Sequence, residues 1–260
     1  MSVDRRSILE QVARGELSPE EADRLLGGDE PAAEAPPAPP EPDSPIQKIK
    51  VTAGFGAIVV IGDPDVAEAD VEGAHSASID GDTLVIRGDV EAVTPGAFAI
   101  HLGPRRHRVG GVRIGSKHAS SLRVRMNPAL ALEAKIDAGP LSITGIAAPI
   151  RARAAAGPIT IEEFDGPLDV SVNAGAVRAI GKITGGESRI RSDAGAVRVE
   201  LDPSSSVRIF ADAALGKVIL PGAEEPERRR FGSRREATIG TGEGVLRVET
   251  AMGSINVTVG

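Results

Sequence analysis

The chain contains no cysteine, tryptophan or tyrosine, and only five phenylalanines and three methionines occur among its 260 residues. Without cysteine it can have no disulfide, no thiol nucleophile and no cysteine-ligated metal centre. The shortage of aromatic rings argues against base stacking on single-stranded nucleic acid. We therefore expect no nucleic-acid partner, no cofactor, no metal site and no catalytic residue.

Long apolar runs are also missing from the sequence. No stretch of about 18 apolar residues is present, so we expect no transmembrane segment. The first apolar segment, Ile8–Val12, is interrupted by charge and too short to be the core of a secretory signal. These features predict a cytoplasmic protein.

The acidic residues are concentrated near the N-terminus. Residues 1–45 hold 11 of the 37 acids and 4 of the 30 bases, which accounts for the whole formal net charge of −7. Residues 92–132 contain no acid, and their bases predict a surface for an acidic protein partner, for peripheral contact with an anionic membrane, or for the chain's own acidic N-terminal segment or neighbouring residues 63–91. The bases of this predicted basic surface are Arg105, Arg106, Arg108, Arg113, Lys117, Arg123 and Arg125.

Two short helices are predicted within residues 1–28. Apolar residues recur at helical spacing in residues 5–14, and Gly15 can end the first helix. Ser18 and Glu21 form a capping box around Pro19 at the start of the second. Helices this short need a partner for their apolar stripe, so we expect docking onto another protein or self-association. The docking residues would be Ile8, Leu9, Val12, Leu17, Leu25 and Leu26.

A linker follows at residues 29–45, where seven prolines lie between positions 31 and 45. Proline fixes φ and removes a hydrogen-bond donor, so this segment should act as a semi-rigid spacer reaching roughly 45 Å. The predicted organisation is a helical pair over 1–28, this linker over 29–45, and one β domain over 46–260.

The β domain contains a repeat organised around glycine. Apolar residues recur two and four positions after each of several glycines and five and seven positions before most of them, as expected for strand, turn and strand. The interval from Gly56 to Gly139 leaves room for about four irregular units, and a further unit is expected near Ile239. The glycines of the repeat are Gly56, Gly139, Gly157, Gly175, Gly195, Gly216 and Gly253.

These units predict an all-β fold, specifically a single-domain β-solenoid carrying the N-terminal helical pair on its linker. Each unit is too short to bury a core alone, so neighbouring units must stack. A thin interior of Val, Ile, Leu and Ala would also explain the scarcity of aromatics. An antiparallel sandwich is the competing interpretation, because its strands and turns have similar lengths.

Several segments resemble known bacterial proteins. Residues 80–87, residues 122–128 and the Ala-Gly-x-Val units are similar to a bacterial β-strand-repeat family described as adhesin-like and of unknown function. That resemblance implies a solenoid-like all-β fold without established catalytic residues. Residues 8–26 are similar to the SHOCT-like helical module found attached to such repeats, which implies a link to envelope stress.

Two chemical alternatives have weaker support. His101, His107 and His118 match no compact metal-ligand spacing, and the surrounding arginines would repel a cation. A polysaccharide-cleaving solenoid would need two acids facing one cleft. The carboxylates that could serve are Asp165, Asp169, Asp193, Asp202 and Asp212, most of them at expected turns.

The sequence therefore predicts a non-enzymatic scaffold or interaction protein, with a surface-displayed adhesin-like protein as the alternative. A solenoid hydrolase is a third and weaker hypothesis.

Overall fold

The computed structural model describes Arg14 and residues 45–88, 121–222 and 232–260. The chain divides into two units, Met1–Asp43 and Ser44–Gly260, and the description below concerns the second. The helical pair and linker predicted for 1–28 and 29–45 lie outside the described residues, except for Arg14 and Pro45. The proposed domain boundaries therefore stay predictions.

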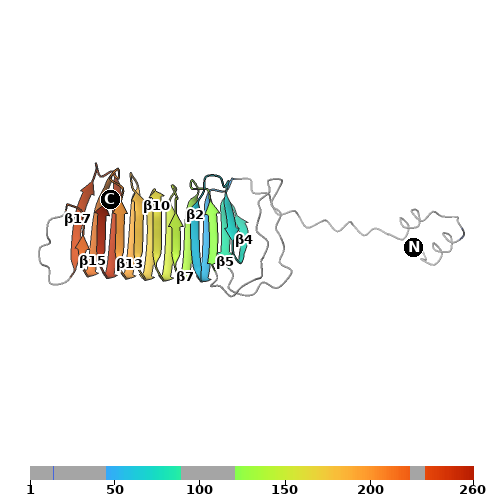
Figure 1. The fold of residues 1–260 in the computed structure, drawn as a ribbon, viewed down its shortest axis with the longest axis horizontal. Helices are drawn as coiled ribbons and strands as arrows, with labels where there is room; N and C mark the ends of the chain where they lie inside the picture. The colour runs from blue at the N-terminus through green and yellow to red at the C-terminus, as the bar shows by residue number, and fades with distance from the viewer. Residues whose placement is uncertain (1–13, 15–44, 89–120, 223–231) are drawn as a thin grey trace, which may run out of the picture. The chain divides into compact units, whose positions relative to one another are not determined.

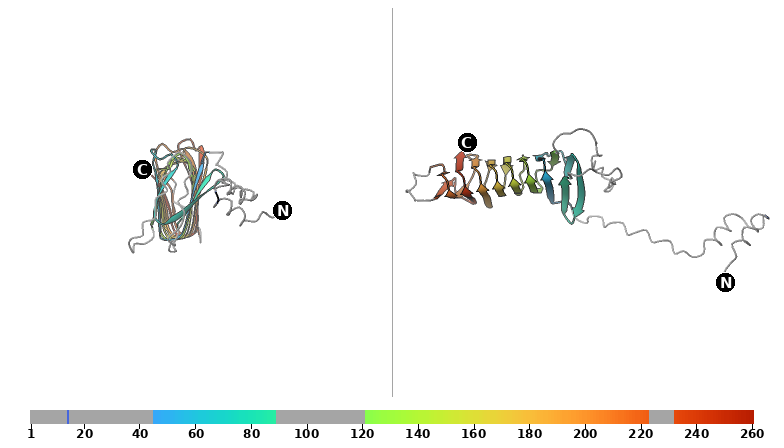
Figure 2. Two further views of the ribbon diagram at one scale, coloured as in Figure 1. Left: turned by 90° about the vertical axis from the view of Figure 1, so that its right-hand side faces the viewer. Right: turned by 90° about the horizontal axis from the view of Figure 1, so that it is seen from below.

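The second unit consists of two large β-sheets that face each other (Figures 1 and 2). The ten-stranded sheet has the order β17, β15, β18, β13, β11, β9, β7, β1, β5, β4, and the nine-stranded sheet has the order β16, β19, β14, β12, β10, β8, β2, β6, β3. The ten-stranded sheet comprises β17 (Ser233–Ile239), β15 (Val207–Leu215), β18 (Gly244–Met252), β13 (Glu187–Ala194), β11 (Leu168–Ala174), β9 (Ile150–Ala156), β7 (Ala131–Ala138), β1 (Lys48–Phe55), β5 (Thr83–Gly88) and β4 (His75–Asp80). The nine-stranded sheet comprises β16 (Val218–Ile219), β19 (Ile255–Val259), β14 (Val197–Leu201), β12 (Val177–Lys182), β10 (Ile159–Asp165), β8 (Leu141–Thr144), β2 (Ala57–Gly62), β6 (Ser121–Met126) and β3 (Ala69–Glu72).

Most neighbouring strands run parallel, because the chain leaves one sheet, turns a corner and continues in the other. The antiparallel pairs are β4 with β5, β3 with β6, and β17 with β15, each at the edge of a sheet. The core lies between the sheets and is filled by one side of each strand, as in β9, where Ile150, Ala152 and Ala154 are buried. Alternate residues therefore point to the core and to the surface.

The repeat glycines stack in one row at a corner between the sheets. A Cβ on Gly175 would lie 2.1 Å from the carbonyl oxygen of Gly157, far inside van der Waals contact, and Gly175 has a φ of +153°. The residue before each glycine forms a second row, which we name the corner row. In stacking order the corner row is Phe55, Ala138, Ala156, Ala174, Ala194, Met252 and Leu215.

The stacking order differs from the sequence order in two places. β1 lies directly beside β7, and β2 beside β8, so no repeat unit separates Gly56 from Gly139 in the stack. The intervening strands β3 to β6 extend the sheets outward instead. At the other end β18 lies between β13 and β15, and Ile239 belongs to the antiparallel edge strand β17 rather than to a further repeat. Neither expectation for these gaps was right.

The predicted fold class therefore needs correction. The described residues form two large, mostly parallel sheets and contain no helix, so the N-terminal helical pair named in that prediction is not seen. The expected single series of two-strand units fails for two reasons. Both ends of the stack incorporate antiparallel strands, and the unit of β18 and β19 stacks between the unit of β13 and β14 and that of β15 and β16. The all-β character is as predicted, whereas the antiparallel sandwich is not observed.

One aromatic side chain enters the core through a local irregularity. Phe164 is only 2% exposed, and it follows Glu163, whose φ of +54° accompanies a register shift in β10. This bulge reverses the alternation, so Phe164 points inward. The neighbouring strand provides the space, since a Cβ on Gly181 would lie 2.6 Å from the phenylalanine Cδ1. The expectation of a purely aliphatic interior misses this residue.

The glycine row predicts the effect of a single methyl group. Gly175→Ala would push a Cβ against the backbone of the adjacent coil, so we expect a loss of ~3 kcal/mol or more in the free energy of unfolding. Chemical denaturation would measure it. Gly185→Ala is the matched control, because a Cβ there meets nothing within 4 Å; equal losses in both variants would contradict the steric explanation.

Candidate functional site

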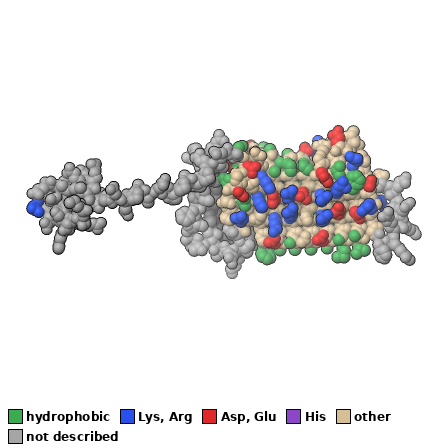
Figure 3. Space-filling model, turned by 180° about the vertical axis from the view of Figure 1, so that it is seen from behind, with side chains coloured by type: hydrophobic (Ala, Val, Ile, Leu, Met, Phe, Trp, Pro, Cys, Tyr) green, Lys and Arg blue, Asp and Glu red, His purple; other side chains and the backbone are tan. Residues whose placement is uncertain are grey.

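The outer face of the ten-stranded sheet carries charged side chains in straight rows (Figure 3). The rows arise because parallel strands in register place equivalent positions side by side at about 4.8 Å. We name two of them. The mixed row is Lys50, Glu133, Arg151, Asp169, Arg189, Arg247, Phe210 and Glu236. The basic row is Arg87, Thr52, Lys135, Arg153, Ser171 and Arg191, on β5, β1, β7, β9, β11 and β13.

Most charges of the mixed row have an oppositely charged neighbour. Arg151 Nε donates to a carboxylate oxygen of Asp169 at 2.9 Å. Arg247 lies over the ring of Phe210, with its guanidinium carbon 5.1 Å from the ring centroid, and also contacts Glu187 at 3.4 Å. Opposite charges on neighbouring strands stabilise the sheet modestly, so this row contributes to cohesion between coils.

Glu133 forms the shortest ion pair of any residue in the mixed row. Its carboxylate lies 2.5 Å from Lys48 Nζ and 3.3 Å from Lys50 Nζ, and its side chain is 19% exposed. The hydrogen bond from Lys48, assisted by Lys50, holds the pKa of Glu133 below its usual range, while partial burial opposes that shift. Glu133 thus links β1 to β7, which lie side by side although they are far apart in the sequence.

The basic row differs from the mixed row, because none of its own six positions holds an acid. Lys135 Nζ lies 3.6 Å from Asp137, and Arg191 donates to Glu249 at 2.8 Å. Arg87 and Arg153 form no ion pair within the described part of the chain. Thr52 and Ser171 place hydroxyl groups between the bases. The row spans roughly 24 Å and leaves positive charge available to a partner.

Beyond Arg191 the same line of positions becomes acidic. Glu249 and Asp212 lie side by side on β18 and β15, and each has an arginine partner. Arg191 Nη2 contacts Glu249 at 2.8 Å, and Arg234 Nη2 contacts Asp212 at 2.5 Å. This arrangement ends the basic row at a defined strand.

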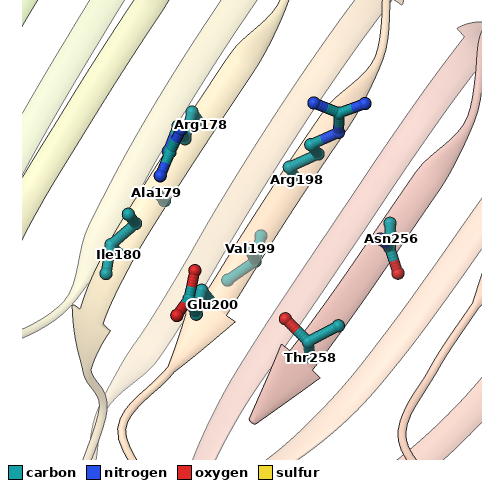
Figure 4. A pocket seen from close by; sticks show the side chains of 8 residues that line it. All are labelled: Arg178, Ala179, Ile180, Arg198, Val199, Glu200, Asn256 and Thr258. Carbon is teal, nitrogen blue, oxygen red and sulfur yellow. The ribbon is translucent and has the colours of Figure 1, made fainter. Parts of the chain in front are cut away.

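The nine-stranded sheet has a shallow depression over β12, β14 and β19 (Figure 4). Arg178, Arg198 and Asn256 occupy one line across these strands, while Glu200 and Thr258 lie on the next. The two arginines are directly opposite each other, and neither forms an ion pair with another described residue. The nearby Glu200 carboxylate makes this surface less positive than the basic row.

Two members of the predicted basic surface are described, Arg123 and Arg125 on β6. The antiparallel strand β3 places Glu72 opposite Arg123 and Asp70 opposite Arg125. Arg125 also bonds Asp63, whose pKa is lowered by the backbone hydrogen bond from Asp65 and by the guanidinium. Acids therefore face both arginines. Arg105, Arg106, Arg108, Arg113 and Lys117 lie outside the described residues.

Other predicted sites are only partly covered. All the docking-helix residues, together with His101, His107 and His118, lie outside the described residues. Among those described, no group of three or more metal-ligating side chains occurs, and no helix is long and apolar enough to cross a bilayer. Asp169 and Asp212 are ion-paired, and Asp202 accepts hydrogen bonds from Ser204. Asp165 ends β10 and Asp193 lies in β13.

Sequence reasoning missed the basic row although its signal is present. Counting back four positions from Gly56, Gly139, Gly157, Gly175 and Gly195 gives Thr52, Lys135, Arg153, Ser171 and Arg191. The apolar positions of the repeat do not show this row, which appears only in the outward-facing positions of the same units. Arg87 could not be found this way, because β5 does not precede one of the repeat glycines and joins the row by pairing with β1.

Comparison with known proteins gives little. No family model matches the chain, which leaves the SHOCT-like module unconfirmed, and no curated protein matches it. A crystal structure of a candidate cell adhesion protein from Clostridium sporogenes is similar at a TM-score of 0.44 with 16% identity, covering 85% of this chain and 96% of its own.

The position of Glu133 predicts a pH dependence. Because its pKa is lowered in the folded state, Glu133 stabilises the protein above the usual carboxyl range and loses that effect as the pH falls through its folded value. Glu133→Gln should lower the free energy of unfolding by ~0.5–1 kcal/mol at pH 7 and by much less well below about pH 4. Denaturation at both pH values measures this. Glu162→Gln, without an ion pair among described residues, should show no such difference; a loss for Glu133→Gln that does not change with pH would contradict the assignment.

Proposed function

We propose that the chain is a non-enzymatic interaction protein whose basic row holds an extended acidic segment of a partner protein. The observation that carries this proposal is the run of six in-register positions without an acid, four of them basic. An extended chain laid along the stack could meet these bases in succession.

The rigidity of the face supports binding. The bases project from strands whose neighbours on both sides hold them in a fixed register, so little backbone order would be lost on association. Within these two rows the central strands β7 to β13 also favour an anion, whereas Asp137, Glu187 and Asp193 lie nearer the strand ends. Across the mixed and basic rows these strands present five bases and two acids: Lys135, Arg151, Arg153, Arg189 and Arg191 against Glu133 and Asp169.

Charge reversal tests the proposal. The double variant Lys135→Glu/Arg153→Glu should weaken binding of fluorescent poly-L-glutamate at least tenfold, a loss of ~1.4 kcal/mol, and binding of the parent chain should weaken as salt rises. Fluorescence anisotropy measures both effects. The control variant Arg178→Glu/Arg198→Glu also reverses the charge of two bases, but on the nine-stranded sheet.

The outcomes separate the alternatives clearly. Equal weakening in the test and control variants would show that only overall charge matters and would overturn the basic row as the site. Tighter binding to vesicles containing anionic lipid than to poly-L-glutamate would favour the peripheral membrane contact considered from the sequence.

Two settings are compatible with such a surface. A cytoplasmic scaffold is the first, and its connection with envelope stress rests on the sequence resemblance. An adhesin-like protein displayed on the cell is the alternative. Protease treatment of intact cells distinguishes them, since cleavage from outside would contradict the cytoplasmic scaffold.

A further inference from the structure

The corner row is an exposed apolar strip that the basic row does not explain. Phe55, Met252 and Leu215 are 65%, 57% and 54% exposed, and the four positions between Phe55 and Met252 are alanines. Figure 3 shows hydrophobic side chains along the lower edge of the stack. Across the glycines, the adjoining positions are Ala57, Pro140, Pro158, Ala176, Ala196, Ser254 and Lys217, uncharged until the last.

The strip runs along seven strands, so it is roughly 29 Å long. The largest apolar patch on a soluble protein is often a functional surface. We propose that a second copy of this chain covers the corner row, with the two stacks antiparallel and related by a two-fold axis at Ala174.

The order of side-chain sizes in the corner row favours the antiparallel arrangement. Large residues lie at both ends and alanines lie between, so reversing the row about Ala174 places Met252 against the partner's Ala138. Phe55 then meets the partner's Leu215, and Ala174 meets its own copy. A parallel arrangement would instead oppose each of the three large residues to its own copy, including Met252, which the antiparallel arrangement places against an alanine. Self-complementarity of this kind is what a two-fold interface requires.

The charges beside the strip are compatible with this pairing. Asp137 and Asp193 are exposed on the flank formed by the ten-stranded sheet. In the antiparallel arrangement Asp137 lies opposite the partner's Ala251, and Asp193 lies opposite the partner's Ala155. At the two-fold axis, Asn173 meets its own copy. No acid faces an acid across the interface, so charge does not oppose association.

The area of the strip sets the strength of the dimer. A strip about 29 Å long and about 10 Å wide buries roughly 300 Å² on each copy, well under the ~800 Å² per partner of a standard interface. The dimer should therefore be weak and concentration-dependent, with a Kd of micromolar or weaker. A covalent trap is consequently the appropriate probe.

The absence of native cysteine makes that trap specific. In full-length Ala174→Cys, the introduced thiol lies on the two-fold axis and can react only with its counterpart in another copy. Under mild oxidation we expect a disulfide-linked dimer of twice 26.8 kDa, formed at least tenfold faster than in Ser171→Cys. Ser171 lies on the same strand but on the charged face, which makes it a matched control.

A charge pair tests the register. Ala156→Glu alone should abolish dimerisation seen by sedimentation at high protein concentration, because it places a carboxylate opposite the partner's Ala194. Ala156→Glu/Ala194→Lys should restore it, since each new acid then meets a new base. In a parallel dimer the double variant would oppose like charges and would not recover.

Two results would overturn the proposal. One is cross-linking of Ala174→Cys no faster than that of Ser171→Cys, which is also the outcome if self-association occurs through residues 1–28. The other is failure of the double variant to recover although circular dichroism shows that it is folded. Neither result bears on the basic row, which lies on a different surface and is tested separately.

Discussion

The close stacking of the corner glycines is the constraint on which the rest of the structure depends. The carbonyl oxygen of each glycine lies where the Cβ of the next residue in the row would be, at 2.1 Å for Gly157 and Gly175. Only hydrogen fits, so the chain can turn sharply while adjacent coils keep sheet spacing. Backbone hydrogen bonds continue through the corner, as from Gly157 N to Ala174 O at 2.8 Å.

The corner glycines set the register of the strands, and the register determines which residues form the surface rows. Once each coil starts from the same point, a residue four positions before the glycine always faces outward and lies beside its equivalent on the next strand. The basic row is one such line, and the corner row is another. A short repeat in the sequence thereby becomes two long surfaces in space, one charged and one apolar, without any deep pocket being required.

The sequence was most informative where the repeat is regular. The positions two and four after each glycine are buried, as with Ile159 and Ile161 in β10, because alternation is a local property of strands. Local patterns failed where the outcome depends on which strands pair. The placement of β18 between β13 and β15 is one example. The pairing of β3 with β6, in contrast, gives Arg123 and Arg125 acidic neighbours from residues 63–91, which was one of the alternatives for the basic surface.

Aromatic content was also a limited guide to packing. The scarcity of rings correctly suggested small aliphatic filling, yet Phe164 is buried because a bulge at Glu163 and a glycine at position 181 act together. Neither signal is visible without knowing that β10 and β12 are neighbours. The basic row, in contrast, could have been found by extending the glycine alignment to its outward positions.

The distance between spin labels on the outer face tests the in-register stack most directly. Labels at Lys135 and Glu249 lie four strand spacings apart, roughly 19 Å, and labels at Lys135 and Asp212 lie five apart, roughly 24 Å. Pulsed electron resonance on the two doubly labelled chains should therefore give the shorter distance for the pair at 135 and 249. The reverse order, or broad distributions for both pairs, would contradict a stack whose rows are set by the corner glycines.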